Sequence, residues 1–210
     1  MIGIYGGTFD PVHFGHLRPV LDVYSLLNLS EIRFIPCGHP AHRDAALASS
    51  QQRLEMLALA IEGQPDFIVD DREVKRSGAS YMVDTIKSLM SDFSNKKFCL
   101  IIGMDAFVKL DTWKDWEEIT ELVSLVITQR PRLETESVPS SDLIQYMNNK
   151  RISDKELFIS SEQTHCFFCP VTQLDISATN IRELVREGSR IDYLMPEKVA
   201  NYIQEKNLYR

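Results

Sequence analysis

Two histidines, His13 and His16, lie three residues apart near the start of the chain, shortly after a pair of glycines. They belong to the segment Gly6–Arg18, GGTFDPVHFGHLR, which follows the short apolar run Ile2–Tyr5. A glycine turn between a buried strand and a helix directs backbone N–H groups and the positive end of the helix toward an anion. Gly15 has no side chain and would let a phosphate chain approach closely. The pattern predicts a nucleotide phosphate site; the alternative is that the histidines only cap the helix.

The common phosphate and metal motifs do not fit this chain. The segment is neither the G-x-G-x-x-G of dinucleotide-binding enzymes nor a Walker A loop, which needs Gly-Lys-Ser/Thr. His13 and His16 have no third ligand nearby in the sequence, and Cys166 and Cys169 form only half of a zinc-type pattern. With four cysteines in 210 residues, reduced thiols are expected. We therefore predict no metal ligand from the protein.

Strand-like and helix-like segments alternate along the chain, which is typical of βαβ units and a parallel sheet. Strands are predicted over 2–5, 32–35, 67–69, 98–102, 122–128 and near 166–168. Helices are predicted over 17–29, after a cap at Ser49 or Ser50 (apolar positions Leu54, Leu57, Ala58 and Ile61), after a cap at Ser80 (Val83, Ile86, Met90 and Phe93), over 177–187, and from Pro196 to about Lys206. Residues 131–161 are more polar and are expected to form an irregular excursion from the sheet.

These elements predict a Rossmann-like α/β fold, an open parallel sheet with helices on both faces. One domain is expected over residues 1–210, with a sheet core over about 1–170 and a small helical portion over about 171–210.

The composition narrows the classes of protein. A net charge of −7 and a pI near 5.3 disfavour a nucleic-acid partner, which would require clustered Lys and Arg. No basic leader with an apolar core and no apolar run of about 20 residues is present, so neither a signal peptide nor a membrane partner is expected. The sequence predicts a cytoplasmic protein and leaves open whether it forms a homo-oligomer.

Two motifs about 160 residues apart give a specific resemblance. Residues 6–16 resemble the N-terminal signature of the nucleotidyltransferase superfamily with the H-x-G-H motif, and Asp175–Arg182, DISATNIR, resembles its I-S-x-T-x-I-R motif. Further tracts resemble the bacterial nicotinate-mononucleotide adenylyltransferases: Ile101–Asp105, Asp111–Trp113, Gln129–Pro131 and Asn207–Arg210. The resemblance implies transfer of AMP from ATP to the phosphate of nicotinate mononucleotide, giving deamido-NAD and pyrophosphate.

That reaction suits the residues present. A phosphate monoester is already an anion at pH 7, with a second pKa of about 6, so no base is needed to activate it. His13, His16 and Arg182 are expected to stabilise charge on the phosphates. The expected ATP-binding residues are Gly6, Gly7, Thr8, Phe9, Gly103, Asp105, Ile176, Ser177 and Thr179. Mg²⁺ is expected to be carried mainly by the ATP phosphates.

The mononucleotide side departs from the family pattern. Its expected residues are Cys37, His42, Arg43, Tyr81, Met82, Trp113 and Arg130. Cys37 and Gly38 stand where family members usually carry Asn-Asn, and Met82 stands where they carry threonine. The preference for acid over amide is therefore open. The alternatives are a related enzyme that accepts nicotinamide mononucleotide or phosphopantetheine, and a non-catalytic nucleotide sensor.

Overall fold

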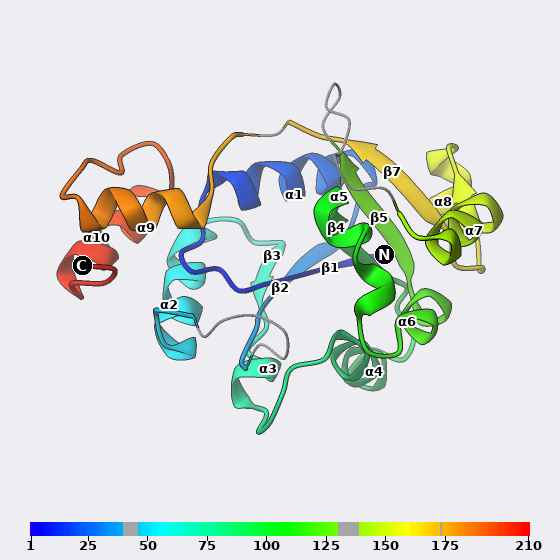
Figure 1. Ribbon diagram of the computed structural model, residues 1–210. Helices are drawn as coiled ribbons and strands as arrows, with labels where there is room; N and C mark the ends of the chain where they lie inside the picture. The colour runs from blue at the N-terminus through cyan, green and yellow to red at the C-terminus, as the bar shows by residue number, and fades with distance from the viewer. Residues whose placement is uncertain (40–45, 130–138, 173) are drawn as a thin grey trace. The chain divides into compact units, whose positions relative to one another are not determined.

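A computed structural model describes residues 1–39, 46–129, 139–172 and 174–210 (Figure 1). Its strands are β1 (Ile2–Gly7), β2 (Glu31–Pro36), β3 (Phe67–Val69), β4 (Phe98–Gly103), β5 (Ser124–Gln129), β6 (Arg151–Ile152) and β7 (Cys166–Pro170). Its helices are α1 (Phe14–Leu26), α2 (Ser50–Ala60), α3 (Arg72–Lys75), α4 (Met82–Asp92), α5 (Met104–Phe107), the 3-10 helix η1 (Leu110–Thr112), α6 (Trp116–Leu122), α7 (Ser141–Lys150), α8 (Lys155–Ser160), α9 (Ala178–Arg186) and α10 (Glu197–Glu205).

The strands form a seven-stranded sheet in the order β3-β2-β1-β4-β5-β7-β6. The neighbouring pairs β1–β4, β4–β5, β5–β7 and β6–β7 are parallel. This sheet, with helices between its strands, confirms the predicted parallel α/β fold. No helix in the described part of the chain is long and apolar enough to cross a membrane.

The contacts within the chain divide it into two compact units. Unit 1 consists of Met1–Tyr5, Leu21–Ile32 and Tyr81–Thr172, and unit 2 consists of Gly6–Val20, Arg33–Ser80 and Gln173–Arg210. The prediction of a single domain with a helical portion over about 171–210 stays a prediction.

Unit 1 has its core in the adjacent strands β4, β5 and β7 (Figure 1). Residues 98–102 of β4 and 124–128 of β5 are all buried, as expected for strands covered on both faces. The expected strand at 122–128 begins two residues later, because Leu122 ends α6.

The expected irregular excursion over 131–161 is wrong for its described part. Residues 139–161 contain α7, β6 and α8, and β6 pairs with β7 at the edge of the sheet. Leu143 and Tyr146, one turn apart, are the buried residues of α7. Phe158 of α8 packs its ring 5.3 Å from that of Phe167. The buried residues of α7 follow a helical period, although the segment as a whole is polar.

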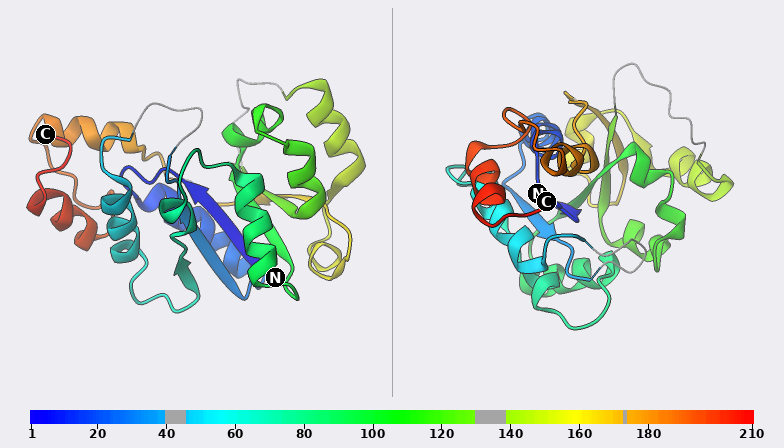
Figure 2. Two further views of the ribbon diagram at one scale, coloured as in Figure 1. Left: turned by 90° about the horizontal axis from the view of Figure 1, so that it is seen from below. Right: turned by 60° about the vertical axis from the view of Figure 1, so that its left-hand side comes forward.

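Unit 2 contains α2, α9 and α10, and α10 lies against α2 in Figure 1 and in both views of Figure 2. The Tyr202 hydroxyl of α10 donates a 2.6 Å hydrogen bond to Glu55 Oε2 of α2. Val199 and Ile203 are buried, as predicted. Pro196, expected in the first turn, is the residue just before the helix.

Helix α1 begins and ends three residues earlier than predicted. The carbonyl of His13 accepts from the backbone N–H groups of both His16 and Leu17, so the helix starts at the motif itself. Asn28 has a left-handed φ of 47°, and the Leu29 N–H turns back to Tyr24 O. This closing bond is typical of a helix C-terminus.

The caps and buried faces of α2 and α4 correct two further expectations. Of the two expected caps, Ser49 or Ser50, Ser49 caps α2, and it does so in a capping box with Gln52. The buried residues of α2, however, are Arg53, Met56 and Leu57, whereas Leu54 is half-buried and Ala58 is exposed.

The expected Ser80 cap of α4 is wrong, since Tyr81 holds that position and the Ser80 Oγ accepts from the His39 N–H at 3.3 Å. The buried residues of α4 include Val83, Ile86 and Leu89, and not Met90 or Phe93.

Candidate active site

The first phosphate motif forms the start of α1 in unit 2. His13 precedes the helix and His16 lies in its first turn. Their rings face each other, with centroids 3.8 Å apart and planes inclined by 31°. The ring of Phe9 meets His16 edge-on at 5.3 Å. The two imidazoles are therefore neighbours, as their spacing predicts.

Burial keeps both imidazoles uncharged near neutral pH. It lowers the pKa of His13 to about 4, and burial together with His13 lowers the pKa of His16 to about 3. A neutral imidazole has one N–H donor and one acceptor nitrogen. Both Nδ1 atoms are buried without a hydrogen-bond partner among the described residues. If the proton is on Nε2, the buried Nδ1 carries a lone pair and no N–H is left there without an acceptor. The Nε2–H can then donate to a ligand.

Gly15 marks the place where the two motifs meet. A Cβ atom added to it would lie 2.9 Å from atoms of the His13 ring and 2.9 Å from the carbonyl oxygen of Ile176. Such distances are too short for a side chain, so only glycine fits here. The backbone of the second motif thus passes directly beside the first.

The second motif forms the start of α9. Ser177 caps the helix, its Oγ accepting from the Asn180 N–H at 3.1 Å, as predicted. Arg182 is half-buried and donates from Nη1 to the carbonyl of Asp10 at 2.7 Å and from Nη2 to Thr179 Oγ1 at 3.3 Å. Arg182 is therefore not an isolated surface charge, since its guanidinium ties the second motif to the backbone of the first.

Arg53, which the sequence analysis missed, supports the turn after β1. Its side chain lies in α2 and is almost fully buried. Nη1 donates to the Thr8 carbonyl at 2.6 Å, and Nη2 donates to the carbonyls of Cys37 at 2.6 Å and Gly38 at 3.3 Å. One guanidinium thus holds the chain after β1 and the chain after β2.

Asp10 is the second residue whose role was missed. Its buried carboxylate accepts from the Leu47 N–H at 2.8 Å and the Ala48 N–H at 3.1 Å. It also accepts from the Tyr209 hydroxyl at 2.7 Å. Asp10 therefore fixes the motif through its side chain, while its carbonyl accepts from Arg182.

The remaining expected residues of unit 2 lie near this turn. Gly6 and Gly7 end β1, and the Gly7 carbonyl accepts from the Cys37 N–H at 2.9 Å. Cys37 is half-buried with a free thiol. His42 and Arg43 lie outside the described residues.

Unit 1 holds the expected ATP-binding residues Gly103 and Asp105 and the described mononucleotide-binding residues Tyr81, Met82 and Trp113. Gly103 ends β4 and precedes α5, and the Asp105 Oδ1 lies 2.5 Å from where a Gly103 Cβ would stand. The exposed Asp105 carboxylate therefore folds back over Gly103. Burial, with the charge of Asp105, raises the pKa of Tyr5.

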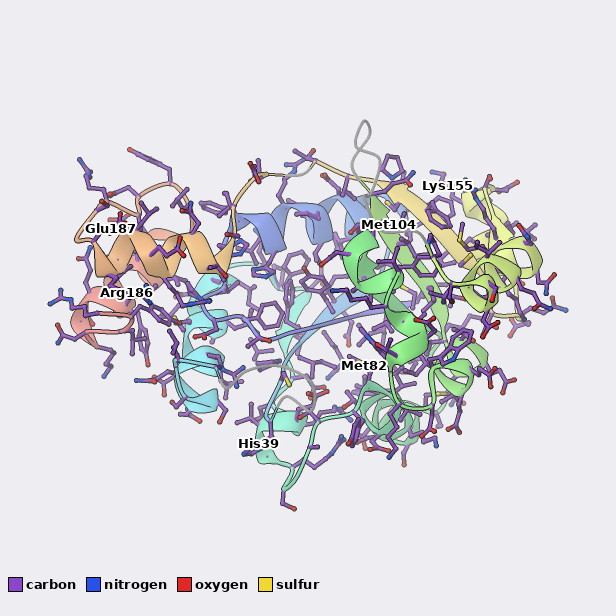
Figure 3. All side chains as sticks on the ribbon, in the orientation of Figure 1. His39, Met82, Met104, Lys155, Arg186 and Glu187 are labelled. Atoms are coloured by element: carbon purple, nitrogen blue, oxygen red, sulfur yellow. The ribbon has the colours of Figure 1, made fainter. Side chains whose placement is uncertain are left out.

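The other three described residues of this set are partly exposed. Tyr81 precedes α4, and the Lys114 Nζ lies 4.6 Å from the centre of its ring. Met82 is the first residue of α4, where Figure 3 labels it. Trp113 follows η1 and is half-buried. Arg130 lies outside the described residues.

Within the described ranges, no group of three or more His, Cys, Asp or Glu side chains could hold a metal ion. Cys166 and Cys169 are buried free thiols, and burial raises the pKa of each to about 11. Magnesium bound through ATP phosphates would require no such cluster.

Comparison with known proteins decides the family. The model of the cytidylyltransferase-like family matches residues 4–184. A relative from Hydrogenovibrio crunogenus, named "Probable nicotinate-nucleotide adenylyltransferase", is 44% identical over 211 residues, which cover 100% of this chain and 98% of the relative. A relative of the same name from Methylococcus capsulatus is 41% identical, over 100% of this chain and 99% of its own. The chain belongs to the nicotinate-nucleotide adenylyltransferase family.

A solved adenylyltransferase has the same fold. The Plasmodium falciparum nicotinic acid mononucleotide adenylyltransferase complexed with NaAD aligns with a TM-score of 0.74 at 22% identity, covering 99% of this chain and 96% of that one. The same enzyme complexed with APC gives a TM-score of 0.72 at 21% identity, with the same coverage. At this level of identity the likeness confirms the adenylyltransferase fold alone.

Proposed function

We propose that this chain transfers AMP from ATP to the phosphate of nicotinate mononucleotide, giving deamido-NAD and pyrophosphate in NAD biosynthesis. The observation that carries the proposal is the contact between the two phosphate motifs in unit 2. Gly15 lies against the Ile176 carbonyl, and Arg182 donates to the Asp10 carbonyl. The full-length relatives named for this activity, 44% and 41% identical, support the choice of reaction.

The proposed step is a single in-line displacement. A phosphate oxygen of the mononucleotide forms a bond to the α-phosphorus of ATP, and the bond from that phosphorus to the β-bridging oxygen breaks. The bonding electrons leave with pyrophosphate. Because the attacking phosphate is already an anion, the protein need only hold the two reactants in line and stabilise charge on the phosphoryl oxygens.

His13 and His16 are proposed as the donors to the α-phosphate region. Each neutral imidazole can supply one N–H in a site largely removed from water, where a hydrogen bond to an anion is stronger than in solution. Arg182, which positions the first motif, is proposed to contribute positive charge near the β- and γ-phosphates.

The remaining binding residues are assigned to one or the other of the two substrates. We propose ATP contacts from Gly6, Gly7, Thr8, Phe9, Gly103, Asp105, Ile176, Ser177 and Thr179, and mononucleotide contacts from Cys37, His42, Arg43, Tyr81, Met82, Trp113 and Arg130. The Phe9 ring is buried against His16, so the ATP contact proposed for Phe9 is through its backbone and not through its ring. Mg²⁺ is proposed to arrive with the ATP phosphates. The acidic chain is proposed to act in the cytoplasm without a nucleic-acid partner.

A pyrophosphate-release assay tests the function. Purified protein is given ATP, Mg²⁺ and one of three acceptors: nicotinate mononucleotide, nicotinamide mononucleotide or phosphopantetheine. We expect the highest kcat/KM with the nicotinate compound and no release without an acceptor. A preference for the amide would overturn the acceptor assignment and implicate Cys37, Gly38 and Met82. Absence of release with every acceptor would refute the enzyme and favour a nucleotide sensor.

A further inference from the structure

We propose that Tyr209 is a positioning residue for the phosphate site, acting through Asp10. The inference rests on the proposed function. Its starting observation is the 2.7 Å hydrogen bond from the Tyr209 hydroxyl to Asp10 Oδ1, which joins residues 199 apart in the sequence and is buried. The sequence motifs assign no role to either side chain.

Asp10 connects the Tyr209 hydroxyl to the residues that are proposed to bind the phosphates. Its carboxylate is bonded to Tyr209 and to the chain before α2, and its carbonyl accepts from Arg182. Three residues further along the chain is His13. A carboxylate held by several donors fixes its own backbone, so a shift of Asp10 would move both the Arg182 guanidinium and the start of the histidine segment.

The backbone after α10 forms a turn that places the Tyr209 hydroxyl next to Asp10. Asn207 and Tyr209 both adopt left-handed backbone, with φ of 51° and 65°. The Asn207 N–H bonds to the Gln204 carbonyl and the Leu208 N–H to the Ile203 carbonyl. This turn buries Tyr209 while Arg210 remains exposed. Left-handed backbone is unfavourable for residues other than glycine, asparagine and aspartate, and it persists where surrounding contacts compensate.

The Tyr209 hydroxyl is a donor at any working pH. Burial, followed by the hydrogen bond and charge of Asp10, raises the pKa of this phenol well above its usual value. The phenol therefore stays protonated, and its contribution is geometric.

Tyr202 provides a matched control. Its hydroxyl also donates to a carboxylate, Glu55 Oε2, at 2.6 Å, and it lies in α10 only seven residues before Tyr209. Glu55, however, belongs to α2, and its carboxylate accepts from Gln51 and Tyr202 and not from either phosphate motif. Tyr209→Phe and Tyr202→Phe each remove one hydroxyl and keep the ring, so they differ mainly in which carboxylate loses its donor.

The test compares these two variants with the wild-type chain. Wild-type pyrophosphate release with nicotinate mononucleotide is measured first, so that failure of the proposed function is seen separately. We expect Y209F to lower kcat at least tenfold with less than a threefold change in the KM for ATP, and Y202F to change kcat less than twofold. Amide hydrogen exchange over residues 8–16 should quicken in Y209F only.

Two results would overturn the inference. One is an equal effect of the two variants on kcat, including no effect of either. The other is a Y209F chain that is unfolded by circular dichroism at 15 °C while Y202F is folded, since the bond would then hold the fold and not the site.

Discussion

Acid is predicted to destabilise unit 2 through the two desolvated imidazoles of His13 and His16. The pKa of His13 is about 4 and that of His16 about 3 in the folded chain, against about 6.5 when unfolded. Between these values the unfolded chain binds more protons than the folded one, so the free energy of unfolding falls as the pH drops below 6.5. The loss ends only when the pH falls below the folded pKa values.

The size of the effect follows from the same pKa values. At pH 5 an unfolded histidine is almost fully protonated, whereas His13 and His16 are still mainly neutral in the folded chain. Each then lowers the free energy of unfolding by about 2 kcal/mol relative to pH 7.5, or about 4 kcal/mol for the pair. At this pH the value depends mostly on the unfolded pKa and little on how far below 5 the folded pKa lies.

The assay is urea unfolding at pH 7.5 and pH 5, comparing the wild-type chain with a double variant, His13→Gln and His16→Gln. Glutamine is polar but does not titrate, so every other titrating group contributes equally to both chains. Both tryptophans, Trp113 and Trp116, lie in unit 1. Unfolding of unit 2 should therefore be followed by hydrogen exchange of its own peptides and not by tryptophan fluorescence.

We expect the wild-type chain to lose about 4 kcal/mol more than the double variant between the two pH values. Saturating ATP should reduce this difference, because its phosphates favour a charged imidazole. Equal pH dependence in the two chains would show that the imidazoles are not held neutral by burial, and would refute the reasoning.

Three further predictions concern the same motifs. His16→Ala should lower kcat at least ~10²-fold with a smaller effect on the KM for ATP, measured by pyrophosphate release, and wild-type turnover would contradict its role. Gly15→Ala places a Cβ 2.9 Å from the Ile176 carbonyl oxygen and should therefore lower kcat at least tenfold, with the circular dichroism spectrum unchanged. Normal turnover would show that the two motifs can move apart. Ser177→Ala removes a helix cap and should lower the free energy of unfolding by about 1 kcal/mol, as should the equivalent cap variant Ser140→Ala in α7. Only Ser177→Ala is expected to raise the KM for ATP, and equal kinetics in the two would remove Ser177 from the ATP site.

The sequence predicted the elements whose pattern depends on local chemistry. The apolar run of β4 and the serine cap of α2 need no distant partner to be recognised. The Ser80 cap failed because its Oγ accepts from His39, 41 residues away. The start of α1 was missed because His13, and not a typical capping residue, supplies the first helical acceptor.

The residues of the candidate site likewise include some that the sequence predicted and some that it did not. The histidines and Gly15 were predicted because their types and spacing suit phosphate chemistry. Arg182 was predicted from the resemblance of its motif to the family. Arg53 was missed although it was the one charge at a helical spacing from the buried Met56 and Leu57. Its carbonyl partner Thr8 is 45 residues away, a distance that no periodic pattern reports.

The most direct test of the central claim is the stereochemistry at the transferred phosphorus. One diastereomer of ATP carrying sulfur on the α-phosphate is incubated with the protein and nicotinate mononucleotide, and the configuration of the dinucleotide product is determined. A single in-line displacement predicts a dinucleotide with inverted configuration. Retention of configuration would require an intermediate covalently bound to the protein and would contradict the account, as would the absence of any dinucleotide.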